Sequence, residues 1–206
     1  MTPKSKLILA SSSPRRAEIL RNAGFDFDVV PAHADESRRP GEAATDYVRR
    51  LAEEKAHTVA RQLAKDPASD STFIIGADTV VVIDTEIMGK PSSEANAREM
   101  LRRLSGKTHE VHTGLTVLQG DGAASRTAAE TTRVTFVVLS EKEIEDYIAT
   151  GEPFDKAGAY AIQGRGGKFI SRIEGCYFNV MGLPLARLYE MLRDLNGGAA
   201  VSACQR

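Results

Sequence analysis

The sequence predicts an α/β fold in which helices flank a mixed β-sheet. Segments with strand and helix patterns alternate over the first half of the 206-residue chain, and two longer strand-like segments adjoin near its middle. This succession favours an α/β fold with a mixed sheet. The length predicts one domain, residues 1–195, that needs no disulfide or metal for stability, and residues 196–206 are expected to form a disordered tail.

The first elements are a short strand and a helix separated by three serines. Residues 5–10 are apolar, as in a buried strand, and the serines at 11–13 follow. Pro14 suits the first position of a helix and the last serine suits its N-cap, so a helix begins here. Gly24 is a typical stop signal, and a second strand is expected near residues 26–31.

A polar loop and a long helix precede the central strands. Residues 32–42 form a polar loop long enough to suspect a function. Apolar residues recur at helical spacing over residues 48–63 and predict an amphipathic helix. Residues 73–83 have a strand pattern, and a break or a bend is expected around Asp78.

The second half of the chain follows the same alternation. Ser140 and Glu143 form a capping-box pattern, and the helix that begins there is expected to end near Gly151. The other expected helices span residues 92–104 and 184–195, the expected strands span residues 110–118, 133–139 and 169–173, and residues 151–168 form a glycine-rich loop.

Composition and charge exclude several classes of protein. The 27 basic and 28 acidic residues give a net charge of −1, which argues against binding to nucleic acid or to a membrane surface. Only Cys176 and Cys204 occur, so a disulfide framework is excluded and a reducing compartment is favoured. The longest strongly apolar run, residues 80–83, is too short to span a bilayer. We therefore expect a cytoplasmic protein.

The serine-rich turn is the first candidate site. Its hydroxyl and backbone N–H groups lie at a helix N-terminus, where the helix dipole favours an anion. Arg15 and Arg16 fall in the first helical turn, which disfavours a cation unless a negative group binds there. The turn is therefore either a phosphate site or a solvated helix cap.

Asp78 is the second candidate. It lies in Gly76-Ala77-Asp78-Thr79, within an otherwise apolar strand pattern, where a buried carboxylate without a partner or a metal is unfavourable. An aspartate at a strand end is a candidate general base or Mg²⁺ ligand. The alternative is a turn between two strands.

Two lysines and two histidines are weaker candidates. Lys90 lies in Gly89-Lys90-Pro91, just before an expected helix, where a lysine is usually only solvated. Lys55 lies on the apolar side of its helix, from which it either extends to solvent or reaches a bound phosphate. His109 and His112 are one residue short of the zinc-protease spacing and point to opposite faces of a strand, so both are interpreted as structural.

Seven short segments match one family pattern. They are Leu-Ala-Ser-Ser-Ser-Pro-Arg-Arg at 9–16, Glu54-Lys55-Ala56, Gly-Ala-Asp-Thr-Val-Val at 76–81, Gly-Lys-Pro at 89–91, Leu-Ser-Gly at 104–106, His112-Thr113-Gly114 and Gly182-Leu183-Pro184. Together they resemble the Maf family of nucleotide pyrophosphatases, and the resemblance runs from about residue 6 to residue 195. The second serine of the triplet, Ser12, is often glycine in that family.

The resemblance implies a fold, a reaction and a set of residues. The fold is Maf/ITPase-like, with two lobes around a central cleft. The reaction is hydrolysis of a nucleoside triphosphate to the monophosphate and pyrophosphate, assisted by a divalent cation (Mg²⁺, Mn²⁺ or Co²⁺), in a cytoplasmic homodimer. By the matched motifs, the proton acceptor is Asp78, the specificity residues are Arg15, Thr79 and Gln163, the phosphate-binding residues are Ser11, Arg16, Lys55 and Lys90, and Glu36 joins Asp78 at the metal.

The motifs are compatible with more than one substrate. Ala161-Ile162-Gln163-Gly164 resembles the branch that acts on dTTP and UTP, with modified pyrimidine nucleotides as further substrates. A glutamine amide pairs with the uracil edge, but it also rotates to match cytosine, so neighbours must fix its orientation. The alternatives are a pyrophosphatase for 7-methyl-GTP or another modified nucleotide, and a nucleotide-binding regulator of septum formation without turnover. A carboxylate at Asp78 argues against the regulator, because it would repel phosphates.

Overall fold

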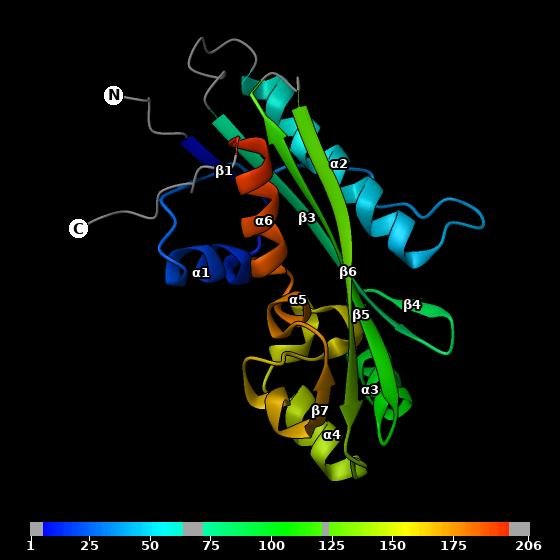
Figure 1. Ribbon diagram of the computed structural model, residues 1–206. Coiled ribbons are helices and arrows are strands. Elements are labelled where there is room, and N and C mark those ends of the chain that lie inside the picture. Colours follow the sequence, from blue (N-terminus) through cyan, green and yellow to red (C-terminus); the bar gives the residue numbers. More distant parts are fainter. Residues whose placement is uncertain (1–5, 64–71, 121–123, 198–206) are drawn as a thin grey trace. The chain divides into compact units, whose positions relative to one another are not determined.

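The computed structural model describes residues 6–63, 72–120 and 124–197 (Figure 1). The predicted disordered tail lies almost wholly outside the described residues. The structure confirms the mixed α/β fold: a seven-stranded sheet has the order β2-β1-β3-β5-β6-β7, with β4 paired to β3. Strand β1 pairs in parallel with β2 and β3, whereas β4 pairs antiparallel with β3 and β7 pairs antiparallel with β6. The strands are β1 (Lys6–Ala10), β2 (Asp28–Val29), β3 (Thr72–Ile83), β4 (Glu86–Met88), β5 (Thr108–Gln119), β6 (Ala124–Phe136) and β7 (Ile170–Glu174).

Two helices, α1 (Pro14–Asn22) and α4 (Glu141–Ile148), begin directly after the predicted capping residues Ser13 and Ser140. At α4 the Ser140 hydroxyl accepts from the Glu143 backbone N–H at 3.3 Å, and the Glu143 carboxylate accepts from the Ser140 N–H at 2.8 Å. No described helix has the combination of length and apolar character that spanning a membrane requires. The helices are α1 (Pro14–Asn22), α2 (Ala44–Leu63), α3 (Glu94–Leu104), α4 (Glu141–Ile148), α5 (Tyr177–Met181) and α6 (Leu185–Leu195), with 3₁₀ turns at Glu152–Asp155, Ala157–Ala159 and Arg165–Phe169.

The structure differs from the sequence prediction in several elements. Strand β3 is continuous through Asp78, so of the two predicted alternatives, a break or a bend, the break is wrong. The strand pairs with β1 as far as Gly76 and with β4 from Val81, so partners on both sides of Asp78 keep it extended. Strand β6 ends at Phe136, three residues before the predicted end, and the sequence analysis missed β4 and α5.

The chain divides into two compact units, which correspond to the two lobes that the resemblance implies; each is described by itself. The first comprises the described residues within Met1–Asp78, Thr113–Glu130 and Gly182–Arg206. The second comprises Thr79–His112 and Thr131–Met181. Strands β3, β5 and β6 each contribute residues to both units.

The core of the first unit is built on β1. Ile8 and Ala10 pack with apolar residues of α2 and β3. Because side chains alternate along a strand, Leu7 and Leu9 point to the opposite face, and they are also buried. Strand β1 is therefore covered on both faces; Figure 1 shows α2 on one side of β1 and β3, with α1 and α6 on the other.

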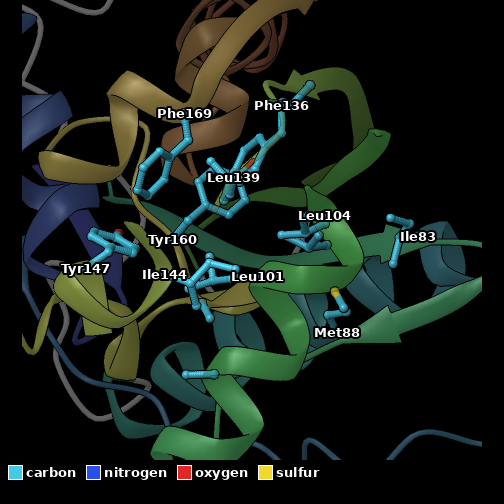
Figure 2. Close-up of a cluster of buried hydrophobic side chains, with 14 of the residues drawn as sticks. Ile83, Met88, Leu101, Leu104, Phe136, Leu139, Ile144, Tyr147, Tyr160 and Phe169 are labelled. Carbon is cyan, nitrogen blue, oxygen red and sulfur yellow. The ribbon is translucent and has the colours of Figure 1, made fainter. Parts of the chain in front are cut away.

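The core of the second unit is a cluster of aromatic and aliphatic side chains (Figure 2). The rings of Phe136 and Tyr160 meet edge to face, with centroids 4.8 Å apart, and those of Tyr147 and Phe169 do so at 5.2 Å. Such geometries add to the stabilisation from burial alone. Leu101 and Leu104 of α3 belong to the same cluster.

Candidate functional site

The Lys55 ammonium is the centre of the candidate site in the first unit. Its Nζ donates to Asp78 Oδ1 at 2.6 Å and to Glu36 Oε1 at 2.9 Å. The residue is only 8 % exposed, so it does not extend to solvent as one interpretation of the sequence allowed. A lysine buried to this degree requires paired charges, and the two carboxylates supply them.

Glycine at position 76 lets α2 bring Lys55 to Asp78. A Cβ added at Gly76 would lie 2.0 Å from the Ala52 carbonyl oxygen and 2.9 Å from the Ala56 nitrogen. The backbones of α2 and β3 therefore touch at this point. Because residues two apart on a strand face the same side, Asp78 faces α2 together with Gly76. Gly114 allows the same approach to β5, since its added Cβ would lie 2.0 Å from the Val48 carbonyl oxygen.

Arg16 is a second buried cation of the first unit. Its Nε donates to the Gly182 carbonyl at 2.7 Å and its Nη1 to the Ser11 hydroxyl at 3.1 Å. Burial lowers the pKa of Arg16, and the charge of Asp78 acts in the opposite direction, so the two charges interact. Ser13 occupies the N-cap position of α1, but its side chain forms no cap hydrogen bond; its N–H instead donates to the Ser11 hydroxyl at 3.2 Å. The serine-rich turn thus organises Arg16.

The loop that carries Glu36 is fixed to α2 by two side chains. Arg50 binds the Glu42 carboxylate with two hydrogen bonds of 2.7 and 2.9 Å and donates to the Ser37 carbonyl at 3.0 Å. The hydrogen bond from Arg50 lowers the pKa of Glu42 to about 2. The Tyr47 hydroxyl donates to the Glu36 carbonyl at 2.7 Å. Burial and the charges of Asp78 and Glu36 raise the pKa of Tyr47, so it remains a neutral donor.

The remaining predicted residues divide between the two units. Arg15 lies in the first turn of α1, half-buried beside Arg16. Thr79, Lys90 and Gln163 belong to the second unit. Lys90 is exposed on the loop after β4, and Gln163 is exposed just before the turn Arg165–Phe169. The structure thus brings five of the predicted residues into one network: Ser11, Arg16, Glu36, Lys55 and Asp78.

Sequence reasoning missed the residues that hold this network in place. Arg50 has the spacing of an ordinary helix-surface pair with Glu54, which it also forms at 3.2 Å, and this concealed its bond to Glu42. Tyr47 lies just before the residues 48–63 whose spacing predicts the helix, so the helical pattern did not include it. Gly76 was recognised only as part of a motif; the small residues of the predicted helix, such as Ala52 and Ala56, were the available signal of a close approach.

Glu36 and Asp78 form the candidate donor set for a divalent cation. Among the described residues, no group of three or more His, Cys, Asp or Glu side chains lies close enough to hold a metal ion. Two carboxylates nevertheless converge on one ammonium. Mg²⁺ is usually held by one or two carboxylates together with phosphates of the substrate. The two side chains fit that requirement in kind.

This arrangement combines a carboxylate able to accept a proton with buried cations able to bind an anion. Asp78 is 13 % exposed at its side chain, and the Lys55 charge offsets its own. Arg16 and Lys55 both lie within its electrostatic reach. Positioned charges of this kind stabilise negative charge that develops on phosphoryl oxygens.

Comparison with known proteins identifies similar sequences over most of the chain. The sequence profile described as "Maf-like protein" matches residues 6–195. The chain is 51 % identical over 187 residues to a dTTP/UTP pyrophosphatase of Koribacter versatilis, covering 91 % of this chain and 93 % of the relative. It is 51 % identical over 195 residues to a dTTP/UTP pyrophosphatase of Geotalea uraniireducens, covering 95 % and 97 %. Among solved structures, the Staphylococcus aureus Ham1 protein matches with a TM-score of 0.40 and 14 % identity, covering 64 % of this chain and 71 % of that one.

Proposed function

We propose a catalytic function for this chain, which belongs to the Maf-like protein family: hydrolysis of dTTP and UTP to the nucleoside monophosphate and pyrophosphate. Two relatives that share about half of their residues with this chain are named dTTP/UTP pyrophosphatase. The observation that carries the proposal is the Asp78 carboxylate held against the Lys55 ammonium, with Arg16 close by.

In the proposed reaction a water molecule attacks the α-phosphorus of the nucleotide. The new bond joins the water oxygen to phosphorus, and the bond from the α-phosphorus to the bridging oxygen of the β-phosphate breaks. Asp78 accepts a proton from the water, and pyrophosphate leaves with the bonding electron pair. Such reactions are accelerated mainly by positioning and by electrostatic stabilisation.

The cations of the site bind the phosphates and allow the Asp78 carboxylate to lie beside them. Lys55, Arg16 and Lys90, together with the Ser11 hydroxyl, are assigned to the phosphate oxygens. The Lys55 charge also reduces the repulsion between Asp78 and the substrate, so a carboxylate can lie beside the phosphates. This favours turnover over a regulator that only binds nucleotide.

Glu36 and Asp78 would hold a divalent cation, for which we propose Mg²⁺, Mn²⁺ or Co²⁺. When bound, such an ion would neutralise charge on the triphosphate and the leaving group. Tyr47 and Arg50 contribute by keeping the loop that carries Glu36 beside α2.

Arg15, Thr79 and Gln163 are assigned to recognition of the base. The Gln163 amide accepts from N3–H and donates to O4 of uracil or thymine. A site that hydrogen-bonds a base edge rejects analogues strongly, because its polar groups are then left unpaired.

A cytoplasmic homodimer stays part of the proposal, and the oligomeric state is measured by analytical ultracentrifugation.

The first prediction is tested with a nucleotide panel. Purified protein is incubated with dTTP, UTP, CTP, GTP and 7-methyl-GTP, and pyrophosphate and orthophosphate are measured separately. We expect dTTP and UTP to be the best substrates, pyrophosphate to be the product, and EDTA to abolish turnover until Mg²⁺, Mn²⁺ or Co²⁺ is restored.

Three results contradict parts of the proposal. Orthophosphate as the product overturns the reaction, a preference for 7-methyl-GTP overturns the substrate, and activity in EDTA overturns the metal. Tight nucleotide binding without any turnover supports the regulator instead.

A further inference from the structure

A pair of side chains in the second unit holds the backbone on both sides of Gln163. The Tyr147 hydroxyl donates to Glu152 Oε1 at 2.8 Å and accepts from the Ala161 N–H at 3.1 Å. The Glu152 carboxylate also accepts from the N–H groups of Arg165 at 3.0 Å and Gly166 at 3.1 Å. The residues from 161 to 166 are therefore tied down at both ends by one connected network.

The pair is itself firmly anchored. Tyr147 is buried in the aromatic cluster with its ring against Phe169 (Figure 2), and burial followed by the Glu152 hydrogen bond raises its pKa, so the phenol keeps its proton. Burial opposes ionisation of Glu152, but the hydrogen bonds from the Arg165 N–H, the Tyr147 hydroxyl and the Gly166 N–H, together with the charge of Lys156, lower the pKa of Glu152 overall. The backbone carbonyl of Glu152 accepts from Lys156 Nζ at 2.8 Å, so the backbone that carries this carboxylate is held as well.

Steric contact adds to the hydrogen bonds. A Cβ added at Gly164 would lie 2.7 Å from either carboxylate oxygen of Glu152, and one added at Gly166 would lie 2.6 Å from the Tyr147 hydroxyl oxygen. Glycine at these positions lets the backbone press directly against the two side chains. The Gln163 side chain is exposed above this supported segment.

We propose that Tyr147 and Glu152 are positioning residues for base recognition: they fix the backbone around Gln163 so that its amide reads one pyrimidine edge. This inference rests on the proposed function. Its physical reason is that neighbouring groups can fix the rotation of a glutamine amide only if the backbone holds the amide in a constant position; on a mobile backbone the amide accepts either uracil or cytosine.

The decisive variant is Tyr147→Phe, which removes a single oxygen and keeps the ring in the core. Its matched control is Tyr160→Phe. Tyr160 is buried in the same cluster, but its hydroxyl bonds His109 Nε2 at 2.8 Å and no backbone group of residues 161–166. Glu152→Ala removes the carboxylate, and Glu152→Gln restores one acceptor oxygen.

Three measurements separate positioning from general stability. Hydrogen exchange at the amides of Ala161, Arg165 and Gly166 is followed by NMR without nucleotide. The dissociation constants of the non-hydrolysable α,β-imido analogues of dTTP and dCTP are measured by calorimetry. The values of kcat and KM are measured for dTTP and dCTP.

In Tyr147→Phe we expect faster exchange at these amides and a loss of about three- to tenfold in the preference for dTTP over dCTP, the range of one hydrogen bond. The loss should appear in KM and in the analogue dissociation constants, with kcat retained, because base contacts serve ground state and transition state equally. Glu152→Ala should have a larger effect than Glu152→Gln, and Tyr160→Phe should have none.

The proposal is overturned if the preference stays unchanged in Tyr147→Phe and Glu152→Ala, even where exchange accelerates, or if Tyr160→Phe loses it equally. Failure of the proposed function looks different: wild-type protein then shows no turnover of dTTP. The analogue and exchange measurements still decide the role of Tyr147 in that case, because neither needs turnover.

Discussion

At the scale of single residues, the Lys55 ammonium explains how two carboxylates coexist beside a proposed phosphate site. Asp78 and Glu36 would repel each other and any triphosphate, and the shared cation reduces both effects. The buried Arg16 adds a second positive charge within reach of Asp78. The charges of the first unit are therefore arranged as a compensated set, in which each member depends on the others.

The change Asp78→Asn tests the base. It keeps the shape of the side chain but removes its ability to accept a proton, so turnover of dTTP should fall at least about a hundredfold, while nucleotide binding persists. Asp84→Asn is the control: Asp84 is an exposed aspartate of the second unit that pairs with Lys107 at 3.2 Å. Turnover by Asp78→Asn at the level of the control would refute the assignment.

The change Lys55→Met tests the shared cation. It leaves the mostly buried Asp78 without its ammonium, so the free energy of unfolding should fall by about 1–3 kcal/mol and turnover at least about tenfold. Lys142→Met removes an exposed lysine that pairs with Asp146, and should change stability by less than about 0.5 kcal/mol. Urea unfolding and pyrophosphate release measure the two effects. Equal stability and equal turnover of the two variants would show that Lys55 contributes no more than an ordinary surface lysine.

At the scale of elements, the contact between α2 and β3 positions the site. The two backbones meet at Gly76, where α2 presents Ala52 and Ala56, and this contact sets how far Lys55 is from Asp78. A helix that stood off by the width of one methyl group would lengthen the 2.6 Å hydrogen bond. The Gly-Ala-Asp motif therefore joins a packing requirement to a chemical one.

The change Gly76→Ala tests this contact. The added methyl would lie 2.0 Å from the Ala52 carbonyl oxygen, so α2 must shift, and we expect a loss of about 1–3 kcal/mol in stability together with reduced turnover. Gly89→Ala is the control for stability, because an added Cβ there meets nothing within 4 Å. Thermal unfolding should separate the two variants clearly, and equal melting temperatures would show that the contact is tolerant.

The elements also show what sequence reasoning can and cannot predict. Local signals succeeded: the capping box at Ser140 and the spacing within α2 gave the correct helices. The predicted alternative of a break at Asp78 was wrong because a charged residue in an apolar strand suggests a break, and its partner Lys55 lies 23 residues away in the sequence. The motifs indicated most residues of the network, but the supports at Tyr147 and Glu152 depend on contacts that no local pattern records.

At the scale of the whole molecule, each unit has its own core and its own share of the proposed function. Asp78, the proposed general base, and most of the residues assigned to the phosphates lie in the first unit. Gln163 lies in the second unit, together with Tyr147 and Glu152, which support it. A change at a residue buried in the second unit can therefore perturb stability and leave every side chain of the Asp78 network in place. The buried His109 offers such a perturbation, because its charge state couples the second core to pH.

The lowered pKa of the buried His109 predicts how the stability of the protein depends on pH. Burial lowers the pKa of His109 to about 4, and its ring lies edge-on against Phe136 with its Nε2 2.8 Å from the Tyr160 hydroxyl oxygen. An unfolded histidine titrates near pH 6.5, so below that pH the unfolded chain binds a proton that the folded chain does not. The free energy of unfolding should therefore fall as the pH drops from about 6.5 towards 4, by about 2 kcal/mol between pH 7 and pH 5.

Urea unfolding of wild type and His109→Gln at pH 7, 6 and 5 measures this contribution. Glutamine can still bond the Tyr160 hydroxyl but does not titrate, so the variant should lose most of the decline. Part of it will remain, because burial also lowers the pKa of His112 despite the charge of Glu110. The other shifted carboxyl groups act at lower pH; that of Glu42, with a pKa of about 2, loses its stabilising effect only as the pH falls below about 4.5. Parallel pH profiles for the two proteins would mean that His109 is protonated without penalty inside the folded second unit.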